Sequence, residues 1–187
     1  MRIILAAAAA ALTVACTPPA GEVDQMSEGC DARATSQWAA GADTFSIEAA
    51  TVGPDCARAV ATFVIRNASG EPIYAEAHVT ANVMTLASAA DPAAMQTALT
   101  EWIDTSNPAF ANTSALPEWP ANADAPTGGE FPFYPDNHPV GYDREAWAAL
   151  RTAAYPMFCY VQGMESLACL TYGDGGIEFI GVQTFPG

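Results

Sequence analysis

The sequence contains no lysine, and six arginines stand against 21 aspartates and glutamates. The formal net charge at pH 7 is therefore −15. A chain this acidic repels nucleic acid and anionic lipid headgroups, so we expect no nucleic-acid partner. A cationic protein or cell-wall partner would be attracted, although scattered acidic residues also serve simply to keep a protein soluble.

The motifs that mark common enzymes and cofactor sites are also missing. There is no GxSxG nucleophile elbow, no HExxH zinc motif, no EF-hand pattern and no glycine-rich phosphate or dinucleotide loop. The cysteines lack the CxxC spacing of zinc sites, so we expect neither a metal nor another cofactor. The two histidines, His78 and His138, leave few options for a general base. These absences favour a non-catalytic protein.

The most informative segment is the N-terminus, which reads MRIILAAAAAALTVAC. One arginine precedes an apolar run that is too short to span a bilayer, since a span takes about 20 residues. This order is typical of a secretory signal peptide that ends at a small-residue cleavage site. The motif Thr13-Val14-Ala15-Cys16 resembles the end of a bacterial lipoprotein signal, with threonine where leucine is commoner.

The lipoprotein resemblance implies an address for the protein. It implies a signal peptide at 1–15, cleavage before Cys16, lipidation of that cysteine and attachment to a membrane. In many such lipoproteins an aspartate after the cysteine retains the protein at the inner membrane. Here that position is Thr17, so the resemblance implies the outer membrane, facing the periplasm. Residues 16–29 would then be the lipidated cysteine and a flexible tether, and residues 30–187 a single domain.

Four further cysteines remain, and an even number in an oxidising compartment indicates two disulfides. We favour the pairs Cys30–Cys56 and Cys159–Cys169. A hairpin loop at 163–165 would place Cys159 opposite Cys169, at a spacing that suits a disulfide. A crossed pairing such as Cys56–Cys159 stays open.

Hydrophobic periodicity predicts an α+β fold with an antiparallel sheet made of two three-stranded meanders. Two helices, with Asp91 and Asp143 at their N-caps, and a long loop rich in proline and aromatic residues at 105–142 lie between the meanders. The expected strands are 44–52, 58–66, 72–80, 157–162, 166–172 and 177–185. In the strand at 72–80, the alternation is expected to turn Ile73, Ala75, Ala77 and Val79 toward the core.

Two groups of residues are candidates for binding. Tyr74, Glu76 and His78 would share the outward face of their strand, where a carboxylate beside an imidazole suits acid–base work. The second group lies in the segment 130–139, where a stiff aromatic surface suits carbohydrate or peptide docking. Its candidate residues are Phe131, Phe133, Tyr134, Asp136 and His138. A solvated sheet face and a loop that covers the core are the simpler interpretations of the two groups.

The sequence favours a non-catalytic envelope lipoprotein that acts as a binding or assembly module at the membrane surface. A second hypothesis is an acidic inhibitor of a cationic cell-wall hydrolase of the lysozyme type. Known inhibitors of that kind include small disulfide-bonded periplasmic lipoproteins, to which the chain is similar in gross features alone. A third is an enzyme that uses Glu76 and His78, or His138 with Asp136 or Asp143.

Overall fold

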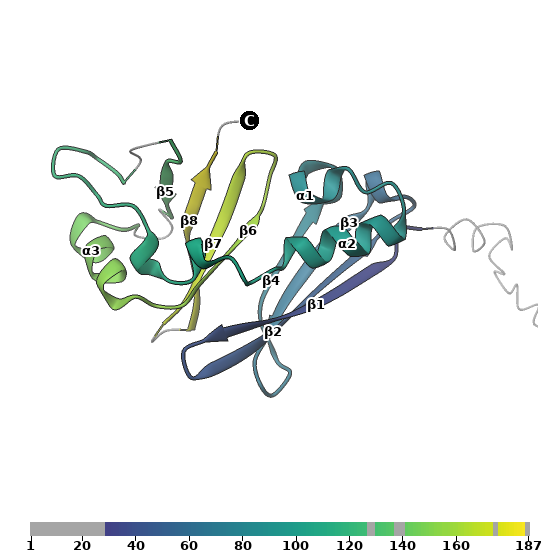
Figure 1. Cartoon of the computed structure of the whole chain (residues 1–187), viewed down its shortest axis with the longest axis horizontal. Coiled ribbons are helices and arrows are strands. Elements are labelled where there is room, and N and C mark those ends of the chain that lie inside the picture. The colour runs from purple at the N-terminus through teal and green to yellow at the C-terminus, as the bar shows by residue number, and fades with distance from the viewer. Residues whose placement is uncertain (1–28, 127–129, 137–140, 174–175, 186–187) are drawn as a thin grey trace, which may run out of the picture.

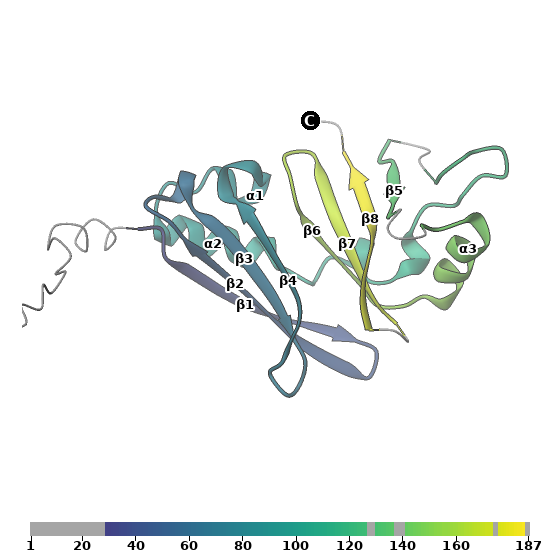
Figure 2. The ribbon, with the colours of Figure 1, turned by 180° about the vertical axis from the view of Figure 1, so that it is seen from behind.

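The computed structural model describes residues 29–126, 130–136, 141–173 and 176–185. The predicted signal peptide, the predicted lipidation site Cys16, the predicted tether up to residue 28 and His138 lie outside these residues. Within them the chain forms two four-stranded antiparallel sheets and three α-helices (Figures 1 and 2). The predicted α+β class is confirmed, and each sheet contains one strand more than the three expected.

The first sheet has the strand order β1-β2-β3-β4. Its strands are β1 (Ala32–Ala40), β2 (Asp43–Val52), β3 (Val60–Arg66) and β4 (Pro72–Val79). The short helix α1 (Met84–Ala87) and the longer α2 (Pro92–Trp102) cover one face of this sheet (Figure 1). Asp91 caps α2 as predicted, since its carboxylate accepts the backbone N–H of Ala94 at 2.8 Å.

The second sheet has the order β5-β8-β7-β6 and lies between the first sheet and α3 (Figures 1 and 2). Its strands are β5 (Phe133–Pro135), β6 (Met157–Val161), β7 (Ser166–Gly173) and β8 (Gly176–Thr184). Helix α3 (Arg144–Ala153) begins at its predicted cap, Asp143, and buries Trp147 and Leu150. Ala154 ends the helix in a left-handed conformation and is exposed.

The two faces of the second sheet contribute to two different cores. The first core joins this sheet to the first sheet and α2, and its aromatic centre is Phe63, whose ring lies 4.5 Å from that of Tyr160. The second core joins the opposite face to α3 and the 105–142 connection. There Phe133 and Trp147 lie 5.4 Å apart. Strands β6 and β7 supply side chains to both cores, because successive residues of a strand point to opposite faces.

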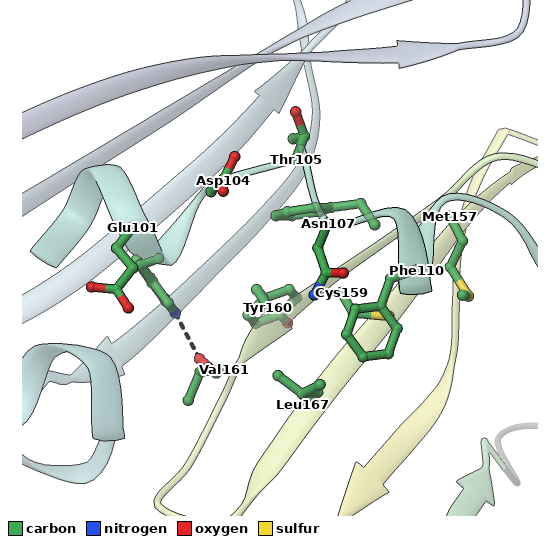
Figure 3. Close-up of a pocket in the computed structure, with 12 residues that line it drawn as sticks. Glu101, Asp104, Thr105, Asn107, Phe110, Met157, Cys159, Tyr160, Val161 and Leu167 are labelled. Carbon is green, nitrogen blue, oxygen red and sulfur yellow. Dashed lines mark hydrogen bonds between the residues drawn. The ribbon is translucent and has the colours of Figure 1, made fainter. Parts of the chain in front are cut away.

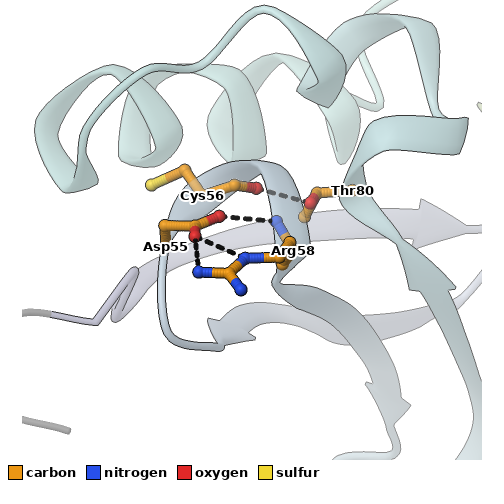
Figure 4. Close-up of polar contacts among 4 residues, drawn as sticks. All are labelled: Asp55, Cys56, Arg58 and Thr80. Carbon is orange, nitrogen blue, oxygen red and sulfur yellow. Dashed lines mark hydrogen bonds and ion pairs between the residues drawn. The ribbon is translucent and has the colours of Figure 1, made fainter. Parts of the chain in front are cut away.

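Both predicted disulfides are present. Cys159 and Cys169 face each other across β6 and β7, which places the hairpin turn where the sequence predicted it. Cys30 is bonded to Cys56, at the start of a 3-10 turn. Figure 4 shows how this turn is held: Asp55 accepts the backbone N–H of Arg58 at 2.9 Å, and the buried Thr80 hydroxyl donates to the carbonyl of Cys56.

One prediction about β4 was wrong. Ile73 and Val79 point outward and are 40% and 45% exposed, while the set Tyr74, Glu76 and His78 lies on the inner face. The register shows this directly, because Glu76 pairs with the fully buried Phe63. Alternation separates two faces of a strand without saying which is buried. Here the face of β4 that carries the tyrosine and histidine rings packs against the aromatic first core.

Candidate functional site

The first predicted group forms a hydrogen-bonded chain on the inner face of β4. The Tyr74 hydroxyl donates to Oε1 of Glu76 at 2.9 Å, and the Tyr160 hydroxyl of β6 is hydrogen-bonded to Tyr74. Burial raises the pKa of Tyr74 to about 12 and also raises the pKa of Tyr160. Both hydroxyls therefore stay protonated at neutral pH and act as donors. The sequence predicted the three β4 residues together but gave no signal for Tyr160.

His78 packs against aromatic side chains of the first core. Its ring meets Trp102 edge to face at 5.7 Å and Tyr160 at 6.0 Å. Its Nε2 atom is buried and has no hydrogen-bond partner among the residues that the structure describes. Burial lowers the pKa of His78, against a weaker opposing effect of the Glu76 carboxylate. The imidazole is therefore neutral at neutral pH, with its Nε2 closed to solvent. The residue also lines a pocket of about 370 Å³ together with Tyr74, Glu76, Tyr160, Gln162 and Phe179.

The second predicted group is divided between two environments. Phe133 is buried in the second core, whereas Phe131 and Tyr134 are 48% and 50% exposed. Strand β5 pairs with β8, and the backbone N–H of Asp136 donates to the carbonyl of Ile180 at 2.9 Å. Within the described part of the segment, the aromatic residues therefore do not form the single docking surface that the sequence suggested.

Phe131 and Phe133 instead line an apolar cavity of about 560 Å³. This volume lies within the range of about 300–1,000 Å³ that is typical of small-molecule sites. None of the described lining residues is charged. The lining comprises Ala109, Phe110, Ala115, Leu116, Pro117, Phe131, Phe133, Met157, Leu167, Cys169, Gln183 and Phe185. The cavity is thus formed by the 105–142 connection, β5 and the outer face of the second sheet.

A smaller hollow of about 160 Å³ adjoins the apolar cavity and shares Phe110, Met157 and Leu167 with it. Figure 3 shows the polar side chains Glu101 and Asp104 at one end of this hollow and the apolar Phe110 and Met157 at the other. Cys159 lines the hollow and its disulfide partner Cys169 lines the cavity, so the disulfide lies in the shared wall. We call this smaller space the acidic hollow.

Sequence reasoning missed the residues that join these two spaces. Met157 and Leu167 fall within predicted strands and Phe110 within the long connection, and no local pattern places the three residues in one site. The high aromatic content of the region 105–142 was the one usable signal, because aromatic residues argue against plain disorder. The site itself depends on how this connection folds back over the second sheet.

Comparison with known proteins adds no assignment. The chain matches no protein-family model, and searches of curated proteins and of solved structures give no match either. Within the described ranges, no helix is long and apolar enough to cross a membrane. The same part of the chain contains no group of three or more histidine, cysteine, aspartate or glutamate side chains that could hold a metal ion.

Proposed function

We propose that this chain is a lipid-anchored binding module of the bacterial envelope that holds a small apolar ligand. The observation that carries the proposal is the cavity of about 560 Å³, whose lining includes four phenylalanines and no charged side chain. Burial of apolar ligand surface contributes about 25 cal/mol per Å² before the costs of binding are subtracted. A cavity of this size and lining therefore suits ligand binding without chemistry.

The arrangement of the chain supports the anchored form of this proposal. Strand β1 begins at one end of the molecule, whereas β5 and α3, which flank the cavity region, lie at the opposite end (Figure 1). An anchor at Cys16, with the tether after it, would attach the protein at the β1 end. The cavity would then face away from the anchoring membrane, with outer-membrane attachment and a periplasmic position as the expected address.

The environment of His78 limits the enzyme hypothesis to one ring nitrogen. An acid–base role needs a nitrogen within hydrogen-bond reach of a substrate atom, and the buried Nε2 offers none, so the role would fall to Nδ1 in the pocket that His78 lines with Tyr74, Glu76 and Tyr160. The inhibitor hypothesis rests on the net charge of −15 and on a gross likeness to small disulfide-bonded periplasmic lipoproteins. If the protein forms a complex with a cationic cell-wall hydrolase, dissociation of that complex at high salt would favour this hypothesis, because salt screens attraction between exposed charges.

The anchor is tested by mass spectrometry of the N-terminal peptide of the protein extracted from envelopes. We expect a peptide that begins at Cys16 and carries fatty acyl groups, and we expect the Cys16→Ala variant to carry none. An unmodified peptide in the wild-type protein would overturn the anchor while leaving the cavity proposal standing.

The cavity is tested in the full chain with a neutral, photoactivatable aryl diazirine, followed by peptide mapping. We expect labelling around Leu116, Met157 and Leu167. An Ala115→Trp substitution should block this labelling by filling the cavity, while Ala93→Trp, on the exposed surface of α2, should not. Ala109→Trp is a second variant that fills the cavity. Labelling that persists in both Ala115→Trp and Ala109→Trp would overturn the proposal.

A further inference from the structure

The acidic hollow continues the uncharged cavity toward a negatively charged surface. Glu101 and Asp104 lie at the end of α2, while Phe110, Met157 and Leu167 close the other end and also belong to the cavity wall (Figure 3). A ligand that follows both spaces passes from an apolar lining to an acidic one. Its own polarity must change along its length in the same way.

The charge in the hollow is uncompensated within the protein. No basic side chain is among the described residues that line it, and neither Glu101 nor Asp104 takes part in an ion pair in the described part of the chain. Within the described ranges, the Asp104 carboxylate accepts hydrogen bonds only from Ser106, at 2.9 Å from the backbone N–H and 2.8 Å from the hydroxyl. These bonds are short-range and leave the negative charge in place.

The walls of the hollow also suit a positive group. The partly exposed Phe110 lines it, and an aromatic face attracts an ammonium group by about 0.5–2 kcal/mol, whereas Trp102 and Tyr160 are 2% and 3% exposed and their rings pack in the first core. Its volume of about 160 Å³ admits a small head group, whereas the adjoining cavity of about 560 Å³ takes the larger apolar part. An anionic head group would meet two carboxylates and a chain of net charge −15.

We propose that the ligand is an alkylammonium amphiphile, with its apolar chain in the cavity and its ammonium group in the hollow beside Glu101 and Asp104. This inference rests on the proposed binding function. It excludes free fatty acids as the preferred ligand, because their carboxylate carries the wrong sign. An aliphatic amine is protonated at pH 7, as lysine is with its ordinary pKa near 10.4.

The test is competition against the diazirine label, with the full chain in phosphatidylcholine nanodiscs at pH 7. The competitors are octylamine, octanol and octanoate, which share one chain length. We expect octylamine to block labelling at a concentration on the order of tenfold lower than octanoate. In the double variant Glu101→Gln/Asp104→Asn this preference should vanish while labelling persists. The competitors partition into lipid to the same extent with every variant. A change in the ratio of the blocking concentrations of octylamine and octanoate therefore reflects binding to the protein.

A matched double variant, Asp31→Asn/Glu145→Gln, removes the same charge from exposed positions outside the lining. We expect it to keep the preference for octylamine. Equal competition by all three compounds in the wild-type protein, or a preference that survives Glu101→Gln/Asp104→Asn, would overturn the inference. Labelling that is absent from the wild-type protein would instead overturn the proposed binding function itself.

Discussion

Trp102 donates its indole N–H to the backbone carbonyl of Val161 at 2.6 Å, and this bond ties the last turn of α2 to strand β6. The two residues are 59 positions apart in the sequence. Trp102 is only 2% exposed, and its ring lies edge to face with Phe63 at 5.3 Å. One side chain therefore links the helix, the first sheet and the second sheet, and it lines the acidic hollow as well.

Trp102→Phe removes this donor and leaves a ring in place. We expect it to lower the free energy of unfolding by about 2 kcal/mol, from the lost hydrogen bond and the unfilled volume. Trp119→Phe is the matched control, because Trp119 donates locally to Ala123 at 2.9 Å in the long connection. Urea unfolding measures both. Equal losses for the two variants would contradict a linking role for Trp102.

Removal of either disulfide should destabilise the protein by an amount that follows the length of the loop it closes. The loop-entropy relation gives about 3.5 kcal/mol for Cys30–Cys56 and about 2.7 kcal/mol for Cys159–Cys169. Paired Cys→Ala variants, one pair at a time, should lower the melting temperature by several degrees, with the larger effect at Cys30–Cys56. An unchanged melting temperature under reductant would show that the disulfides contribute nothing.

His78 should make stability depend on pH in a predictable direction. Burial lowers its pKa below the ordinary value of 6.5, so the unfolded chain takes up a proton more readily than the folded one. The stability that the neutral imidazole contributes is present above pH 6.5 and is lost as the pH falls below it. Between pH 7.5 and 5.5, the wild-type protein should lose more stability than His78→Gln. Parallel pH profiles for the two proteins would refute this.

Gly181 permits β5 to approach β8. Its φ of +142° suits glycine, and a Cβ atom there would meet the carbonyl oxygen of Tyr134 and the ring of Phe133. Gly181→Ala should therefore push β5 outward and weaken diazirine labelling of the cavity. Gly70→Ala, at φ +81° in open space, should cost only about 1 kcal/mol and leave labelling intact. Undiminished labelling in Gly181→Ala would show that the cavity does not depend on β5.

Local patterns predicted much of the fold. The cap at Asp91 and the facing pair Cys159 and Cys169 follow from short-range rules, and the structure confirms them. Such rules work where neighbours in sequence are also neighbours in space. They gave the strands β2, β3, β6, β7 and β8 close to their observed bounds.

The remaining features depend on contacts between distant segments. Strand β1 was missed because its buried positions include Ala32, Ala34 and Ala40, and alanine has little intrinsic preference for strands. Strand β5 is three residues long and exists through its pairing with β8. The cavity could not be predicted for the same reason, because its lining comes from five separate stretches of the chain.

Strands β6 and β7 close the two cores from opposite sides, with Tyr160 and Leu170 facing one core and Met157 and Cys169 facing the other. If β6 and β7 detach from one core, the other core is exposed as well. The two halves of the described chain should consequently melt in a single cooperative transition, and amide hydrogens of β6 and β7 should be the last to exchange with solvent. A ligand held in the cavity would then slow unfolding at the opposite end of the molecule, where β1 begins.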